Sequence, residues 1–265
     1  MYREGDPHSS GQLPDAESKE QEHLVELGRI TLLRHGQTEY TDEYPDLTVE
    51  GKATIEKSAE QIARGLRHEE EPIIVSSDKA RARGSADIIK EKIGYSKEVK
   101  IQPSMTAMQL RDRERAKEIF EEMLAENKNT HKEEAPVRGV DRAYLHDQRF
   151  EDATIYEPRS EVEKRFFKNL EYTIRAFNVV HKHKELQKPH IIGVSHFELL
   201  GQLSEKVFNL SERGEEPLKH GELIEIEVLA SEENNQDQVE LQIYFRGEQK
   251  QVGFDRRTRT LLIGK

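Results

Sequence analysis

The 265-residue sequence contains no cysteine and no long apolar run. Without cysteine, the chain can form neither disulfides nor thiolate metal sites. No hydrophobic stretch approaches the about 20 residues that a membrane-spanning helix needs, and the first residues lack the apolar core of a secretion signal. We therefore expect a cytoplasmic protein without a membrane partner.

The sequence also lacks an excess of basic residues. It has 41 lysines and arginines against 52 aspartates and glutamates, which gives a formal net charge of −11. Because nucleic-acid binding usually needs a basic face, we expect no nucleic-acid partner, although a local basic pocket remains compatible with this charge. The 265 residues suffice for a sizeable core, even with a hydrophobic fraction of 34%.

The chain divides into a polar tail and one predicted domain. Residues 1–27 lack sustained periodicity, which predicts a disordered or weakly helical tail with a possible short helix over 16–27. Residues 28–265 form a single predicted α/β domain. Within it, a helical insert at about 104–159 interrupts the pattern, and we expect this insert to cap the functional site.

Three short apolar runs in this domain predict buried strands, and each is followed by a polar segment and a helical pattern. The alternation predicts a three-layer α/β/α sandwich, with a mostly parallel central sheet and helices on both faces. The predicted strands are 29–33, 72–75 and 191–194, and the predicted helices are 48–66, 78–93, 105–128, 160–184 and 197–210. A hairpin is predicted from 223–229 and 238–245, a further strand at 258–263, and an exposed polar segment at 127–138.

Chemically active side chains follow each of the three runs. Arg34 and His35 come after the first, Ser76–Arg81 follows the second, and Ser195 and His196 end the third. The carboxyl ends of parallel strands meet at one edge of a sheet, where ligands bind in open α/β folds. Two arginines and two histidines would then converge, and guanidinium groups bind phosphate well.

Such a pocket suits phosphoryl transfer. A histidine with one unprotonated ring nitrogen can attack phosphorus and form a covalent phosphohistidine. A second histidine and two arginines would stabilise the transferring group, and a carboxylic acid must protonate the leaving oxygen. This chemistry requires no metal or other cofactor. His181 and His183 lie two residues apart on a predicted helix and point to different faces, so they predict no metal site. We expect His131, His146 and His220 to be ordinary.

Several segments together resemble one known family. They are Leu33–Glu39 (LRHGQTE), Asp46–Gly51 (DLTVEG), Ser76–Ala82 (SSDKARA), Val194–His196 (VSH) and the spaced residues Glu157, Glu161, Val162 and Arg165. In order and spacing they are similar to the signature of the histidine phosphatase superfamily, also called phosphoglycerate mutase-like. The resemblance covers roughly residues 29–210.

The resemblance implies roles for individual residues. It implies His35 as the nucleophile and Arg34, Arg81 and His196 as phosphate ligands, with His196 also acting in catalysis. Thr41 stands where the family often has asparagine and is a further phosphate-binding candidate, as is Glu157, which would contact or orient the pocket. Leu110–Asp112 is similar to the family's segment that carries the general acid, which makes Asp112 the candidate and leaves Glu114 and Glu118 as rivals.

The resulting expectation is a metal-independent phosphatase that hydrolyses a phosphomonoester through a phosphohistidine on His35. Its substrate would be a phosphorylated small molecule or a phosphoprotein. One alternative is phosphoryl transfer of the phosphoglycerate mutase type. Another is a binding or scaffold module that captures phosphate without turnover. No oligomeric state is predicted.

Overall fold

The computed structural model describes residues 24–39, 46–130, 136–231 and 237–263. A single sheet of eight strands runs through it, in the order β3-β2-β4-β1-β5-β6-β7-β8. The strands are β1 (Leu24–Arg34), β2 (Glu70–Ser76), β3 (Lys100–Ile101), β4 (Lys188–Ser195), β5 (Leu223–Ser231), β6 (Gln238–Phe245), β7 (Glu248–Asp255) and β8 (Thr260–Leu262).

The α/β class is confirmed, but the prediction of a mostly parallel sheet is wrong. Strands β3, β2, β4 and β1 pair in parallel, whereas every pairing from β1 through β5, β6 and β7 to β8 is antiparallel. The reason is that the connections between the successive strands after α6 are too short to hold a crossover helix. Such short connections join antiparallel neighbours.

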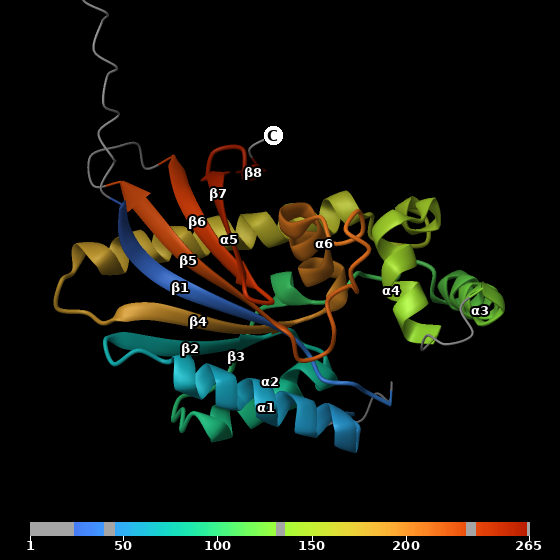
Figure 1. Cartoon of the computed structure of the whole chain (residues 1–265), viewed down its shortest axis with the longest axis horizontal. Helices are drawn as coiled ribbons and strands as arrows, with labels where there is room; N and C mark the ends of the chain where they lie inside the picture. Colours follow the sequence, from blue (N-terminus) through green and yellow to red (C-terminus); the bar gives the residue numbers. More distant parts are fainter. Residues whose placement is uncertain (1–23, 40–45, 131–135, 232–236, 264–265) are drawn as a thin grey trace, which may run out of the picture.

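Helices cover both faces of the sheet (Figure 1). Helices α1 (Val49–Gly65) and α2 (Ala80–Lys92) lie on one face, and α5 (Arg159–Lys182) and α6 (Phe197–Phe208) on the other. Ile55 of α1 and Ile89 of α2 are buried in the core between the first helix layer and the sheet, and Phe177 of α5 and Leu200 of α6 are buried in the core on the other face. These helices are amphipathic and pack their apolar faces against the sheet.

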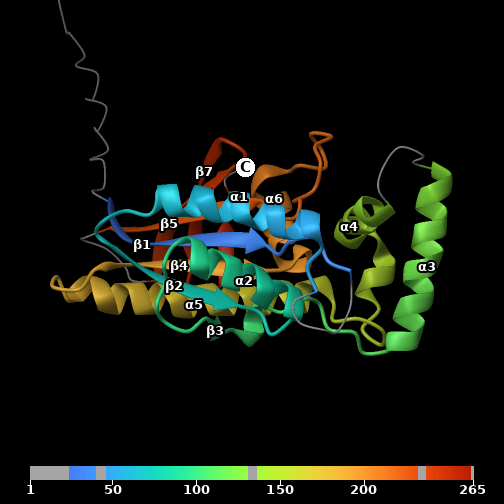
Figure 2. The same cartoon turned by 90° about the horizontal axis from the view of Figure 1, so that it is seen from below.

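Helices α3 (Arg113–Thr130) and α4 (Pro136–His146) lie beyond one end of the sheet (Figure 2). They belong to the segment between β3 and α5, which also contains η1 (Pro103–Met105), packed against β4, and η2 (Gln148–Glu151). Helix α3 begins eight residues later than predicted and buries Ala116, Ile119 and Met123. Helix α4 includes 136–138, the end of the segment that we predicted only as polar and exposed.

Strand β1 begins five residues before the predicted run. Leu24–Leu27, assigned from the sequence to the tail and to its possible helix, form strand because they continue the antiparallel ladder with β5. The preceding residues of the predicted tail lie outside the described residues. No helix in the described ranges is long and apolar enough to span a membrane.

Candidate active site

Strand register brings the predicted site residues to one edge of the sheet. Strands β1 and β4 pair so that Arg34 lies opposite Ser195, and β2 pairs with β4 so that Ser76 lies opposite Val194. The residues that follow these pairs leave the sheet side by side. The parallel half of the sheet therefore brings the residues that follow β1, β2 and β4 together at one edge.

His35 is buried and neutral. Its Nδ1 lies 2.7 Å from the Gly36 carbonyl, and its Nε2 accepts a hydrogen bond of 3.2 Å from Arg81 Nε. Because a carbonyl can only accept, Nδ1 carries the proton and Nε2 keeps its lone pair. Burial holds the pKa of His35 well below its ordinary value, and the repulsion that a protonated His35 would meet from a second imidazolium at His196 and from Arg81 adds to this shift. Nε2 is thus available as a nucleophile.

Gly36 allows the chain to turn directly behind this histidine. A Cβ there would lie 2.6 Å from the Gly51 carbonyl oxygen, at the start of α1. The Gly36 amide also donates to Ser85 Oγ at 3.1 Å, which ties the turn to α2. A larger residue would push the turn away from both helices, and His35 would move with it.

His196 is the second histidine at this edge. Its ring centroid lies 5.0 Å from that of His35, and its Nε2 lies 2.6 Å from Ser77 Oγ. Burial is the main cause that holds the pKa of His196 well below its ordinary value, and Arg81 and Lys79 reinforce it. His196 is also the N-cap of α6, so the first amides of that helix face the same region and favour an anion there.

Arg34 is held between the sheet and α4. Its Nη1 donates to Asp141 Oδ2 and to the Leu218 carbonyl, both at 2.7 Å, and its Nη2 donates to Asp141 Oδ1 at 3.3 Å. The guanidinium carbon lies 4.8 Å from the centre of the Phe197 ring. Burial raises the pKa of Asp141, and Arg34 opposes that shift without cancelling it. The sequence analysis did not single out Asp141.

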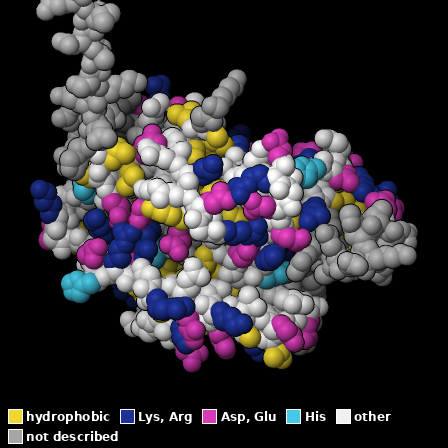
Figure 3. Space-filling view, in the orientation of Figure 1, with side chains coloured by type: hydrophobic (Ala, Val, Ile, Leu, Met, Phe, Trp, Pro, Cys, Tyr) yellow, Lys and Arg dark blue, Asp and Glu magenta, His cyan; other side chains and the backbone are white. Residues whose placement is uncertain are grey.

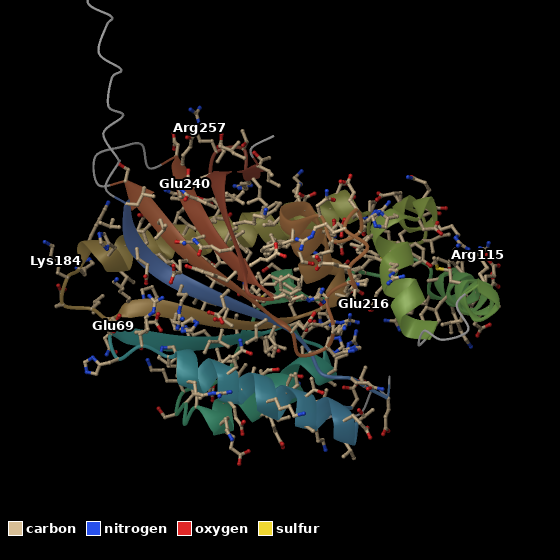
Figure 4. The ribbon with its side chains drawn as sticks, viewed as in Figure 1. Glu69, Arg115, Lys184, Glu216, Glu240 and Arg257 are labelled. Carbon is tan, nitrogen blue, oxygen red and sulfur yellow. The ribbon has the colours of Figure 1, made fainter. Side chains whose placement is uncertain are left out.

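Helix α4 is anchored over the site from two sides. Arg142 donates to Glu216, which lies in the connection before β5, between the end of the sheet and α4 (Figure 4). Arg159, at the start of α5, donates to the Tyr144 carbonyl at 2.8 Å. These contacts fix the helix that presents Asp141 to Arg34.

His220 is a further site residue that the sequence did not indicate. We expected it to be ordinary, yet its ring centroid lies 5.4 Å from that of His35. Burial lowers the pKa of His220 to about 3, with contributions from Arg34 and Arg81. His220 lies in the connection between α6 and β5, which carries no recognisable strand-end pattern.

Three buried nitrogens around His35 have no hydrogen-bond partner among the described residues. They are Arg34 Nε, His196 Nδ1 and His220 Nε2. Buried polar atoms are nearly always paired in folded proteins, so several unpaired nitrogens in one place indicate a binding site. An oxyanion between them would accept hydrogen bonds from all three and would be favoured by the arginines.

Other predicted site residues lie elsewhere. Asp112 is exposed, and its carboxylate accepts from the Arg115 amide at 3.0 Å, which caps α3. Its rivals Glu114 and Glu118 are exposed on the same helix, and Glu118 pairs with Arg115, the residue labelled in Figure 4. None of these three carboxylates lines the cavity that His35, Arg34 and Arg81 share.

Glu157 is buried but is bound to Arg165 rather than to the pocket. Its carboxylate accepts from Arg165 Nε at 2.8 Å and from the Gln109 amide at 3.1 Å. Arg165 in turn donates to the carbonyls of Ser104, Thr106 and Ala107. Glu157 thus holds the chain after η1 in place. Thr41 lies outside the described residues.

A cavity of about 290 Å³ opens beside His35, Arg34 and Arg81. Residues of α3, α4 and η2 form much of its remaining wall, and two carboxylates, Asp141 and Glu198, belong to it. No group of three or more potential metal ligands occurs among the described residues. The arrangement provides a neutral nucleophile, cations and an acid in one cavity.

Comparison with known proteins finds a matching family model. The family model described as the histidine phosphatase superfamily (branch 1) matches residues 30–243. No curated protein matches the sequence.

Solved structures that resemble the chain share its fold at low identity. "Mycobacterial hydrolase 2" is 18% identical, with a TM-score of 0.56 over 84% of this chain and 92% of that one. A mycobacterial glucosyl-3-phosphoglycerate phosphatase in complex with VO3 is 17% identical, with a TM-score of 0.51 over 82% of this chain and 98% of that one.

Proposed function

Because the chain belongs to the histidine phosphatase superfamily, we propose that it hydrolyses a phosphomonoester without a metal, through a phosphohistidine on His35 Nε2. The observation that carries this proposal is the environment of His35. Its neutral Nε2 stands among two arginines and the unpaired nitrogens of His196 and His220.

In the proposed complex, the phosphate takes the place between these groups. Arg34 and Arg81 donate to its oxygens, and Arg81 Nε releases its hydrogen bond to His35 Nε2. A phosphate dianion raises the pKa of neighbouring histidines, so His196 becomes protonated and donates as well. The amide groups at the N-terminus of α6 add further stabilisation.

We assign the general acid to Asp141. Asp141 is the carboxylate that binds Arg34, so a phosphate on the same guanidinium lies directly beside it. The added negative charge raises its pKa beyond the increase that burial already causes, and Asp141 then holds a proton in the substrate complex. This role replaces the one that the sequence suggested for Asp112.

The reaction then has two steps. His35 Nε2 attacks phosphorus, the bond from phosphorus to the ester oxygen breaks, and Asp141 gives its proton to that oxygen, which leaves as the alcohol. Water next attacks the phosphohistidine while the Asp141 carboxylate takes its proton. The phosphorus–nitrogen bond breaks, inorganic phosphate is released, and His35 returns to its neutral form.

Hydrolysis of p-nitrophenyl phosphate in the presence of a chelator tests this function. We expect the wild type to release free phosphate and His35→Asn to lose several orders of magnitude in kcat. His183→Asn is the matched control, because this histidine is 59% exposed at the end of α5 and should leave kcat unchanged. A mutase would instead return an isomerised ester. Absence of phosphate release from a broad panel of esters would contradict the proposal.

A further inference from the structure

Much of the cavity wall beyond the groups that would bind phosphate is apolar. Its apolar residues include Met108, Leu110, Phe120, Phe150 and Tyr156, and the charged side chains of Arg113 and Lys117 on α3 also line the cavity. All of them belong to the segment between β3 and α5, which is separate from the residues that would bind phosphate. This wall therefore faces whatever the phosphate is attached to.

Two of these side chains leave apolar surface open to water. Leu110 is 47% exposed and Phe120 is 39% exposed. Helix α3 turns Ile119 and Met123 into the core, whereas Ala116 and Phe120 line the cavity. Exposed apolar area costs free energy that an apolar ligand would recover, so this surface favours such a ligand.

Neutral hydrogen-bonding groups are scarce in this wall. Among the described lining residues there is no serine, threonine, asparagine or glutamine. Each of the two tyrosine hydroxyls already makes one hydrogen bond, since Tyr144 accepts from Gln202 and Tyr156 donates to the Ala116 carbonyl. Arg113 and Lys117 offer charged donors, but sugar hydroxyl groups that pack against the apolar side chains would leave water without a replacement, which is unfavourable.

With an inference that rests on the proposed function, we infer that the substrate is a phosphate monoester whose leaving group is apolar, either an alkyl chain or an aromatic ring. The phosphate would bind at His35, Arg34 and Arg81. The apolar group would lie against Leu110, Phe120 and Phe150. The residues that select the substrate would thus come from α3, η2 and the chain just before α3.

A series of n-alkyl phosphates from propyl to octyl tests the inference, with glycerol phosphate as the polar counterpart of the propyl ester. We expect kcat/KM to rise about threefold for each added CH2 until the cavity is filled. Propyl phosphate should exceed glycerol phosphate. Phe120→Gln and Leu110→Gln should flatten the rise, whereas Val179→Gln, which changes a 60% exposed apolar residue on α5, should not.

Calorimetric Kd values for the matching n-alkylphosphonates make the result independent of turnover. If the Kd tightens with chain length but no ester is hydrolysed, the apolar site stands and the proposed phosphatase function fails. If phosphohistidine forms but kcat/KM and Kd do not change with chain length, or if glycerol phosphate is the better substrate, the function stands and the inference is overturned.

Discussion

Asp141 and Arg34 form a buried ion pair at the point where the substrate's phosphate would bind. The Asp141 side chain is 16% exposed, and that of Arg34 is 5% exposed. In the free protein the Asp141 carboxylate pairs with the guanidinium of Arg34. Under the proposed function, substrate binding would exchange one anion for another, and the displaced carboxylate would gain a proton.

Replacing Asp141 by Asn tests this role. The effect should depend on the leaving group, because an alkoxide needs a proton to leave whereas nitrophenolate does not. We expect kcat to fall about a hundredfold or more for an alkyl phosphate, but less than about tenfold for p-nitrophenyl phosphate. The KM should fall for both, since the competing charge on Arg34 is gone.

Glu198→Gln provides the control, because Glu198 belongs to the same cavity but to helix α6. It should change both rates by less than about threefold. An equal loss for the two leaving groups in Asp141→Asn would show that Asp141 acts on something other than proton transfer.

The sequence predicted the site residues that directly follow strands. Arg34, His35 and His196 needed only the sheet register to bring them together, and Arg81 lies in the first turn of α2. Asp141 depends instead on how α4 packs over the sheet. His220 depends on the path of a long connection. No local pattern encodes either of these arrangements, and neither residue could be placed from the sequence.

At the scale of elements, helices with long apolar stripes were predicted more accurately than the sheet. The predicted helix at 160–184 differs from α5 by one residue at the start and two at the end. The helix predicted at 78–93 ends within one residue of α2, and Gly94, with a φ of +67°, follows this end. The predicted hairpin strands at 223–229 and 238–245 correspond to β5 and β6, but their attachment to β1 could not be predicted.

Strand β7 and helix α4 are among the elements that were not predicted, and each has a physical reason. Strand β7 begins with the polar run Glu248–Gln251, whose side chains are half-buried or exposed, so it lacks the apolar alternation of a recognisable strand. Helix α4 follows a polar segment that concealed its start. Pro136 at its first position and the spacing of Val140 and Tyr144 were the available signals.

At the scale of the whole molecule, charge is divided between surface and site. The net charge of −11 is carried by a surface on which acidic and basic side chains are interspersed, as Figure 3 shows for one face. The cavity at the end of the sheet collects Arg34 and Arg81 around His35. A local field of this kind attracts anions despite the overall charge.

The buried histidines predict how stability depends on pH. Burial lowers the pKa of His35, His190, His196 and His220 below the ordinary value of 6.5. Below that pH the unfolded chain binds protons that the folded protein excludes. The free energy of unfolding should therefore decrease as the pH is lowered, by a slope that approaches about 1.4 kcal/mol per pH unit for each histidine.

Urea unfolding of the wild type and His220→Asn between pH 7 and pH 5 measures this effect. The variant should lose stability less steeply, by up to about 1.4 kcal/mol per pH unit, because His220 titrates in the folded protein only near pH 3. Parallel curves for the two proteins would show that His220 is not held neutral by the fold.

The central claim is that His35 carries the phosphoryl group during turnover. The most direct measurement is to mix the protein with a ³²P-labelled phosphomonoester, quench in alkaline denaturant, and map the labelled peptide. Phosphate that is stable in alkali, labile in acid and located on His35 is the predicted result, together with its loss in His35→Asn. Label on another residue, or turnover at the wild-type rate in His35→Asn, would contradict the account.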